Sequence, residues 1–180
     1  MSQRWMYDAS EPPTDPPHWH IAAGYIGGDT PHIWTLEEWK AQWAPFLLPI
    51  WTASNRDDTA ASAGNDAWAM WSVLEKLGVP HGVTVAVDIE TAVYKTYLPA
   101  LDEFLNPWKI MAYGSMSTLL KNSTPSGGFW AGDWTDSILT GIDVAGTEGI
   151  VAVQWASATQ LGKDYDASVI ESSVPLWGKP

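Results

Sequence analysis

Two carboxylates, Asp88 and Glu90, stand two residues apart at the end of an apolar run in the sequence. The run, residues 83–91 (VTVAVDIET), is rich in β-branched side chains and follows Pro80 and Gly82, which is typical of a strand buried on both faces. Side chains alternate along a strand, so we expect both carboxylates to point the same way, with Cα atoms about 6 to 7 Å apart. Such a pair could share the acid and base work of one reaction. The alternative is that one caps the next helix and the other is solvated.

Seven further apolar runs predict a set of strands around this one. They are residues 4–7, 20–26, 46–51, 109–113, 128–132, 150–155 and 167–170. Helical patterns cover residues 35–43, 67–77 and 92–105, with a capping box at Thr35, a C-terminal cap at Gly78 and a kink expected at Pro99. Strands separated by helices predict right-handed β-α-β units and a parallel sheet.

Eight such strands predict a closed barrel. A complete (β/α)8 barrel usually takes about 250 residues, whereas this chain has 180. We therefore expect one α/β domain over residues 1–180. It would be a reduced, TIM-like (β/α) barrel of eight mostly parallel strands, with several outer helices missing or shortened.

Further acidic residues lie at the ends of other predicted strands. Asp8 follows the first strand, Asp133 follows the sixth, and Asp166 precedes the eighth. Catalytic groups of such barrels sit at the carboxyl ends of the strands, so we expect these three to share one mouth with Asp88 and Glu90. Neighbouring anions disfavour ionisation, so at least one of the five should have the raised pKa that a general acid needs. Glu90 is the candidate acid.

Thirteen tryptophans are more than a core of this size requires. Those in helical patterns are expected to be packing residues, namely Trp39, Trp43, Trp68 and Trp71. Trp130 and Trp155 instead sit at the ends of the sixth and seventh predicted strands. An amphipathic ring at such a position can line a pocket, so we expect these two to flank a bound sugar.

Composition excludes several classes of partner and cofactor. The formal net charge is −12, and the nine lysines and arginines are scattered, so nucleic acid is not an expected partner. No apolar stretch approaches the roughly 20 residues that span a bilayer, and the first ten residues lack a signal-peptide core. We expect no metal or other cofactor, because the pair His18-x-His20 precedes a strand and would lie at the end of the barrel opposite the acids.

Several segments, taken in order, resemble one known family. They are GNDAWAMWSVLEKLGVPHGVTVAVDIE, YDAS at the first strand, YGS after the fifth, GFWAGDW at the sixth, and VQWAS followed by YDASVI. Together they resemble the glycoside-hydrolase-like barrel domain related to the family 25 glycoside hydrolases, which are lysozyme-like muramidases. The resemblance covers nearly the whole chain. It implies a reduced barrel and cleavage of the β-1,4 bond between N-acetylmuramic acid and N-acetylglucosamine in bacterial cell walls.

The resemblance also implies roles for individual residues. Glu90 would be the general acid/base, and Asp88 its partner or the group that orients the substrate acetamido group. Asp8 and Asp166 match the supporting acids. Three positions would line the sugar cleft: Tyr113, Trp130 and Gln154. Asp133 and Trp155 join them as expected substrate contacts because of their places at strand ends.

A second function remains open at this stage. A barrel of this kind could have lost turnover and serve as a glycan-binding protein or a structural component of a phage virion. Lysozyme-like enzymes without a signal peptide are frequent in bacteriophages. We therefore expect action on the cell wall from a phage virion or from the host cytoplasm before lysis, with phage structural proteins as further partners.

Overall fold

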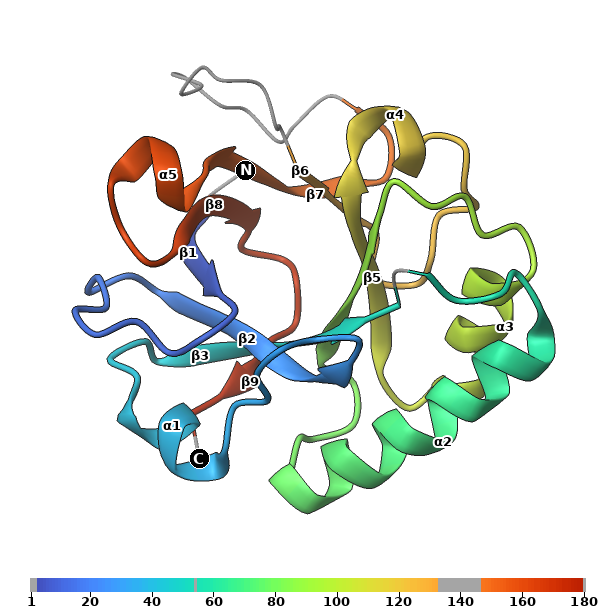
Figure 1. Ribbon diagram of the computed structural model, residues 1–180, viewed down its shortest axis with the longest axis horizontal. Coiled ribbons are helices and arrows are strands. Elements are labelled where there is room, and N and C mark those ends of the chain that lie inside the picture. Colours follow the sequence, from blue (N-terminus) through green and yellow to red (C-terminus); the bar gives the residue numbers. More distant parts are fainter. Residues whose placement is uncertain (1–2, 54, 133–146, 180) are drawn as a thin grey trace.

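Eight strands close into a barrel in the computed structural model, which describes residues 3–53, 55–132 and 147–179 (Figure 1). Neighbouring strands pair in chain order from β1 to β8, and pairings of β1 with both β2 and β8 close the ring. The strands are β1 Gln3–Ala9, β2 Ile21–Gly28, β3 Phe46–Thr52, β4 Thr84–Glu90, β5 Lys109–Ser115, β6 Phe129–Gly132, β7 Ile150–Ala156 and β8 Asp166–Glu171. Each predicted apolar run forms one of them, which confirms the reduced barrel.

The strands are mostly parallel, with β8 as the exception. Strands β1 to β7 run parallel to one another, whereas β8 pairs antiparallel with both β7 and β1. A parallel crossover needs a dozen or more residues, and the connection over residues 157–165 is shorter. The prediction of parallel β-α-β units is therefore wrong for the last strand.

A ninth strand was not predicted. Strand β9, Trp177–Gly178, pairs antiparallel with the start of β3. Two residues are too few to show a periodicity in the sequence.

Within the described ranges, five helices lie outside the barrel: α1 Leu36–Ala41, α2 Ala60–Leu77, α3 Tyr97–Phe104, α4 Met116–Leu119 and α5 Ala158–Leu161. Helix α2 is the longest of these five, with 18 residues, and it lies beside α3 on one flank of the barrel (Figure 1). The Thr35 capping box and the left-handed Gly78 cap are present as predicted. Among the described residues, no helix has both the length and the apolar character to cross a membrane. The outer layer is thus reduced, as the chain length indicated.

Helix α3 is shorter than the sequence pattern indicated. It begins at Tyr97 rather than at residue 92, because the Asp58 side chain accepts hydrogen bonds from the backbone N–H groups of Lys95, Thr96 and Tyr97. Pro99 then falls in the first turn, where its missing N–H has no helical partner to lose. No kink is needed.

The core has two layers separated by the strands. Side chains such as Met6, Ile50 and Met111 fill the barrel interior, while Val87, Ile89 and others face the helices. This alternation is the period of two expected of a strand. Inward positions near the carboxyl ends of the strands are polar instead, and they form the candidate site.

Candidate functional site

Four carboxylates meet at the carboxyl end of the parallel strands, at what we call the acidic mouth: Asp8, Asp88, Glu90 and Asp166. Asp8 is near the end of β1, Asp88 and Glu90 end β4, and Asp166 opens β8. Charge–charge repulsion acts on Asp8 from Asp166 and Asp88, and on Asp88 from Glu90. The structure therefore brings together four of the five predicted acids. Asp133 lies outside the described residues.

Asp166 reaches the mouth because β8 is antiparallel. The first residue of a parallel strand would lie at the opposite end of the barrel, whereas here Asp166 is directly across from Asp8 in the β1–β8 register. Its carboxylate accepts hydrogen bonds from the Ala158 N–H and the Gln154 side chain. Burial nevertheless raises the pKa of Asp166.

Asp8 is the most enclosed of the four acids. Its side chain is 4% exposed. Burial, followed by the charges of Asp166 and Asp88, raises the pKa of Asp8 well above its ordinary value, and a hydrogen bond with Ser168 opposes this rise. Its Oδ1 has no hydrogen-bond partner among the described residues. Asp8 therefore holds a proton more tightly than a free aspartate, and its Oδ1 is enclosed without a hydrogen-bond partner among the described residues.

Asp88 is buried but well hydrogen-bonded. The Tyr25 hydroxyl donates to Oδ2 at 3.2 Å, and the Glu90 N–H donates to Oδ1 at 3.2 Å. Burial, with a smaller contribution from the Glu90 charge, raises the pKa of Asp88 to about 6, while the two hydrogen bonds lower it. Asp88 can therefore change its charge close to neutral pH.

Glu90 is exposed at the end of β4, unlike Asp88. A register irregularity separates the two residues in the β4–β5 ladder, and Glu90 adopts a left-handed backbone with φ 48°. A non-glycine residue in this region is uncommon and carries strain. Ile89 between them faces the outer core. The D-x-E spacing thus gives one buried and one accessible carboxylate.

Gly114 of β5 makes room for the Glu90 backbone. A Cβ at residue 114 would lie 2.5 Å from the Glu90 carbonyl oxygen. We expect Gly114→Ala to lower the free energy of unfolding by roughly 1 to 2 kcal/mol, because the β4 end must shift. Gly178→Ala is the matched control, since a Cβ there meets no atom within 4 Å. Urea denaturation of both variants checks this, and equal stabilities would contradict it.

The predicted sugar contacts lie deeper than expected. Tyr113 and Gln154 are buried beside the acids, with Tyr113 across from Asp88 in the β4–β5 register, and the Tyr113 hydroxyl donates to Gln154 Oε1. Trp130 is fully buried in the barrel interior beside Tyr113, with ring centroids 4.3 Å apart, and its indole N–H donates to Ser168 at 3.2 Å. Trp130 offers no free face, so its predicted sugar stacking is wrong. These three residues pack around the acids as buried supports, with the Gln154 side chain hydrogen-bonded to Asp166.

Other tryptophans also differ from the prediction. Trp155 is half-buried among the residues of the outer layer and packs edge-on against Trp5, with centroids 5.6 Å apart. It therefore does not line the mouth. Of the four tryptophans assigned to helix packing, Trp39 is fully buried, whereas Trp43 lies beyond the end of α1 and is 65% exposed. Trp68 and Trp71 on α2 are 78% and 39% exposed. The helical spacing did not show which face of each helix was covered.

Tyr25 is the site residue that the sequence reasoning missed. It occupies an inward position on β2, next to the barrel interior, and its hydroxyl binds Asp88. A signal was present, since Tyr25 lies two residues before the Gly27-Gly28 pair that ends the predicted strand. An inward polar side chain at that point faces the mouth.

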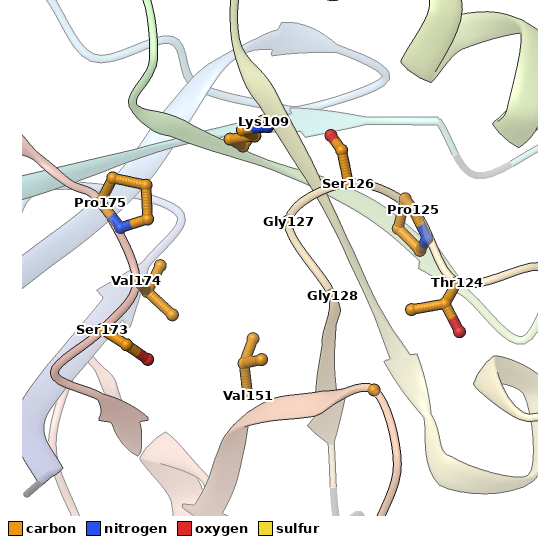
Figure 2. A pocket seen from close by; sticks show the side chains of 11 residues that line it. Lys109, Thr124, Pro125, Ser126, Gly127, Gly128, Val151, Ser173, Val174 and Pro175 are labelled. Carbon is orange, nitrogen blue, oxygen red and sulfur yellow. The ribbon is translucent and has the colours of Figure 1, made fainter.

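A pocket of about 180 Å³ opens beside the acidic mouth, with Asp8, Asp166 and Tyr25 in its lining. A larger one, about 360 Å³, lies at the opposite end of the barrel (Figure 2). Val151 and Val174 point into that second pocket, and Lys109 and Ser126 are at its border (Figure 2). None of the four mouth acids lines it, so the acid chemistry belongs to the first end. The described residues contain no group of three or more histidine or acidic side chains suited to a metal ion.

Comparisons with known proteins find similar structures but no matching sequence. No protein-family profile and no curated protein sequence matches the chain. A Tat-secreted protein of Mycobacterium tuberculosis, solved in complex with L-tartrate, is similar with a TM-score of 0.69 and 12% identity, over 97% of this chain and 99% of that one. GHIP, a glycosyl hydrolase 25 of Streptococcus pneumoniae, is similar with a TM-score of 0.66 and 12% identity, over 94% of this chain and 87% of GHIP.

A third similar structure is a modular protein. The autolysin LytC of Streptococcus pneumoniae, in complex with a synthetic peptidoglycan ligand, has a TM-score of 0.58 and 13% identity, over 94% of this chain and 47% of LytC. At these identities the similarity concerns the fold alone. The structural neighbours thus include a family 25 glycosyl hydrolase and an autolysin in complex with a peptidoglycan ligand.

Proposed function

We propose that this protein is a glycoside hydrolase that cleaves β-1,4 bonds in bacterial cell-wall peptidoglycan. The observation that carries the proposal is the carboxylate pair on β4, in which the accessible Glu90 stands beside a buried Asp88 with a pKa of about 6. Glycosidases typically use two carboxyl groups in different environments. The peptidoglycan ligand of LytC and the family of GHIP support this substrate class.

Glu90 acts as the general acid/base. Its exposed side chain can reach a glycosidic oxygen at the mouth, donate a proton to the leaving sugar and later accept one from water. Asp88 is the partner. Held by Tyr25 and the Glu90 N–H, its ionised oxygen stabilises the positive charge that develops on the sugar, directly or through the acetamido group. Asp8 and Asp166 hold the sugar from the other side.

This assignment predicts the acidic limb of the pH–rate profile. Activity requires ionised Asp88, so the rate should rise with pH through about 6. Tyr25→Phe removes a hydrogen bond that lowers the pKa of Asp88, so the acidic limb should move to higher pH by up to about one unit. Tyr7→Phe is the control, because the Tyr7 hydroxyl binds Gln42 instead. If the pH–rate profiles of the wild-type protein and Tyr25→Phe have the same acidic limb, Tyr25 does not lower the pKa of Asp88.

The function itself is tested by incubating the wild-type protein with purified peptidoglycan. We expect new reducing ends to appear with time, and mass spectrometry to find muropeptides ending in N-acetylmuramic acid. Chitooligosaccharides, which lack muramic acid, show whether the activity depends on that sugar. If the protein binds these glycans without releasing reducing ends, it is a glycan-binding protein and the hydrolase proposal fails.

A further inference from the structure

A chain of buried hydrogen bonds, which we call the Ser168 relay, runs from Trp130 on β6 to Asp8 in the acidic mouth. The Trp130 indole N–H donates to the Ser168 hydroxyl at 3.2 Å, and the Ser168 side chain is hydrogen-bonded to Asp8. An indole N–H can only donate, and a hydroxyl carries a single proton. Because Ser168 accepts from Trp130, its own proton is directed to the Asp8 carboxylate. The relay therefore has a fixed direction.

A second chain, the Gln154 relay, reaches Asp166 in the same way. The Tyr113 hydroxyl donates to Gln154 Oε1, and the Gln154 side chain is hydrogen-bonded to Asp166. Since the amide oxygen is occupied by Tyr113, the group that Gln154 offers to Asp166 is its N–H donor. A carboxylate oxygen is the acceptor that matches this donor. Gln154 thus presents a donor to one acid of the mouth, as Ser168 does to another.

The two relays lie side by side in the barrel interior. Gln154 and Ser168 are opposite each other in the β7–β8 register, and Ser168 is fully buried. Tyr113 and Trp130 are opposite each other in the β5–β6 register, with ring centroids 4.3 Å apart. Polar groups so far from water depend on one another for hydrogen bonds. The barrel packing therefore fixes the donors before any substrate arrives.

The relays act against the surroundings of the two acids. Asp8 on β1 is 4% exposed, and it faces the charges of Asp166 from β8 and Asp88 from β4, with Tyr25 of β2 as a further neighbour. Burial and these charges raise the pKa of Asp8, and burial raises the pKa of Asp166. The hydrogen bond from each relay lowers the pKa of its acid. Both relays thus favour the charged form of an acid that burial disfavours.

We propose that Ser168 and Gln154 are positioning residues of the acidic mouth: each turns a donor toward one acid, Asp8 or Asp166, and favours the negatively charged form of that acid during catalysis. This inference rests on the proposed function. The transition state of glycoside cleavage carries positive charge on the sugar ring, which a preorganised anion stabilises. Neither residue touches the sugar, because each acts through the acid that it holds.

Carbon-13 NMR titration of the aspartate carboxyl groups tests the relays without any substrate, and Asp8→Asn and Asp166→Asn assign the two signals. Ser168→Ala should raise the pKa of Asp8 by about one unit or more, as loss of a hydrogen bond to a charged group implies. Gln154→Met should do the same for Asp166. Thr84→Val is the matched control and should change neither value. Its hydroxyl is also fully buried, but it lies at the start of β4, at the other end of the barrel, and has no partner among the described residues.

Rates of peptidoglycan cleavage then separate positioning from packing. Ser168→Ala should lose roughly tenfold in rate in mild acid, and the loss should shrink as pH rises, because deprotonation of Asp8 restores the charge that the hydrogen bond favoured. A loss of the same size at every pH would overturn the positioning role, since it would show that Ser168 serves packing alone.

Unchanged carboxyl pKa values in folded Ser168→Ala and Gln154→Met proteins would overturn both relays. If circular dichroism shows that Ser168→Ala is unfolded, Gln154→Met decides the question on the second relay. Failure of the hydrolase proposal is a separate result, since it would appear as absent reducing ends with the wild-type protein while the carboxyl shifts of the variants persist.

Discussion

Replacing Glu90 with glutamine is expected to reduce the rate of peptidoglycan cleavage by about 10² to 10⁴-fold. The amide keeps the size of the side chain but cannot deliver a proton. Because Glu90 is exposed at the end of β4, the substitution should leave the fold and the thermal midpoint nearly unchanged. Initial rates of reducing-end release, with circular dichroism spectra of both proteins, provide the measurement.

A matched control separates the effect of losing the Glu90 proton from the effect of losing one negative charge. Glu103 is an exposed glutamate on α3, outside the acidic mouth. Glu103→Gln changes the net charge by the same amount and should retain the wild-type rate. A well-folded Glu90→Gln protein with near-wild-type turnover would remove Glu90 from the mechanism.

Asp88→Asn is expected to stabilise the protein at neutral pH while reducing its activity. The pKa of Asp88 is raised to about 6 from 3.8, so the folded state binds this proton more tightly than the unfolded state. The stabilisation that protonated Asp88 gives the folded state is complete below pH 3.8 and is lost as pH rises through 6. Above that pH, ionised Asp88 costs up to about 3 kcal/mol relative to a neutral side chain. The site thus trades stability for function.

Chemical denaturation at several pH values measures this effect. The free energy of unfolding of Asp88→Asn should exceed that of the wild-type protein at pH 8, and the difference should shrink as pH falls through 6 toward 4. The raised pKa values of Asp8 and Asp166 act in the same direction, so the wild-type protein should also be more stable in mild acid than at neutral pH. A difference that does not depend on pH would contradict the assignment of the shift to Asp88.

The strand positions could be predicted because a strand buried on both faces leaves an apolar run that needs no tertiary context. The direction of β8 could not be predicted from its residues, since a six-residue strand has the same period in either direction. The shortness of the connection over residues 157–165 was the available clue. The start of α3 depended on Asp58, a distant loop residue whose capping role no local pattern reveals.

Asp8, Asp88 and Glu90 were predictable as neighbours because the carboxyl ends of parallel strands converge in a closed barrel, whereas Asp166 opens β8 and joins them only because that strand is antiparallel. The environments of these acids were not predictable. The separation of a buried Asp88 from an exposed Glu90 arises from an irregularity in pairing with β5 and from the space at Gly114. Trp130 shows the same limit, because alternation indicates that a ring points inward but not that it will be covered completely. The hydrogen bond between Tyr25 on β2 and Asp88 on β4 could not be predicted, because it forms only when the strands close into the barrel.

The most direct test of the account is a crystal structure of the Glu90→Gln variant with a bound peptidoglycan fragment. We predict that a glycosidic oxygen lies within hydrogen-bond distance, about 3 Å, of the side chain at position 90, with the adjoining sugar between Asp88 and Asp8. A fragment bound only at the other end of the barrel, in the pocket of Figure 2, or only on the outer tryptophans would contradict the assignment of the acidic mouth as the site of cleavage.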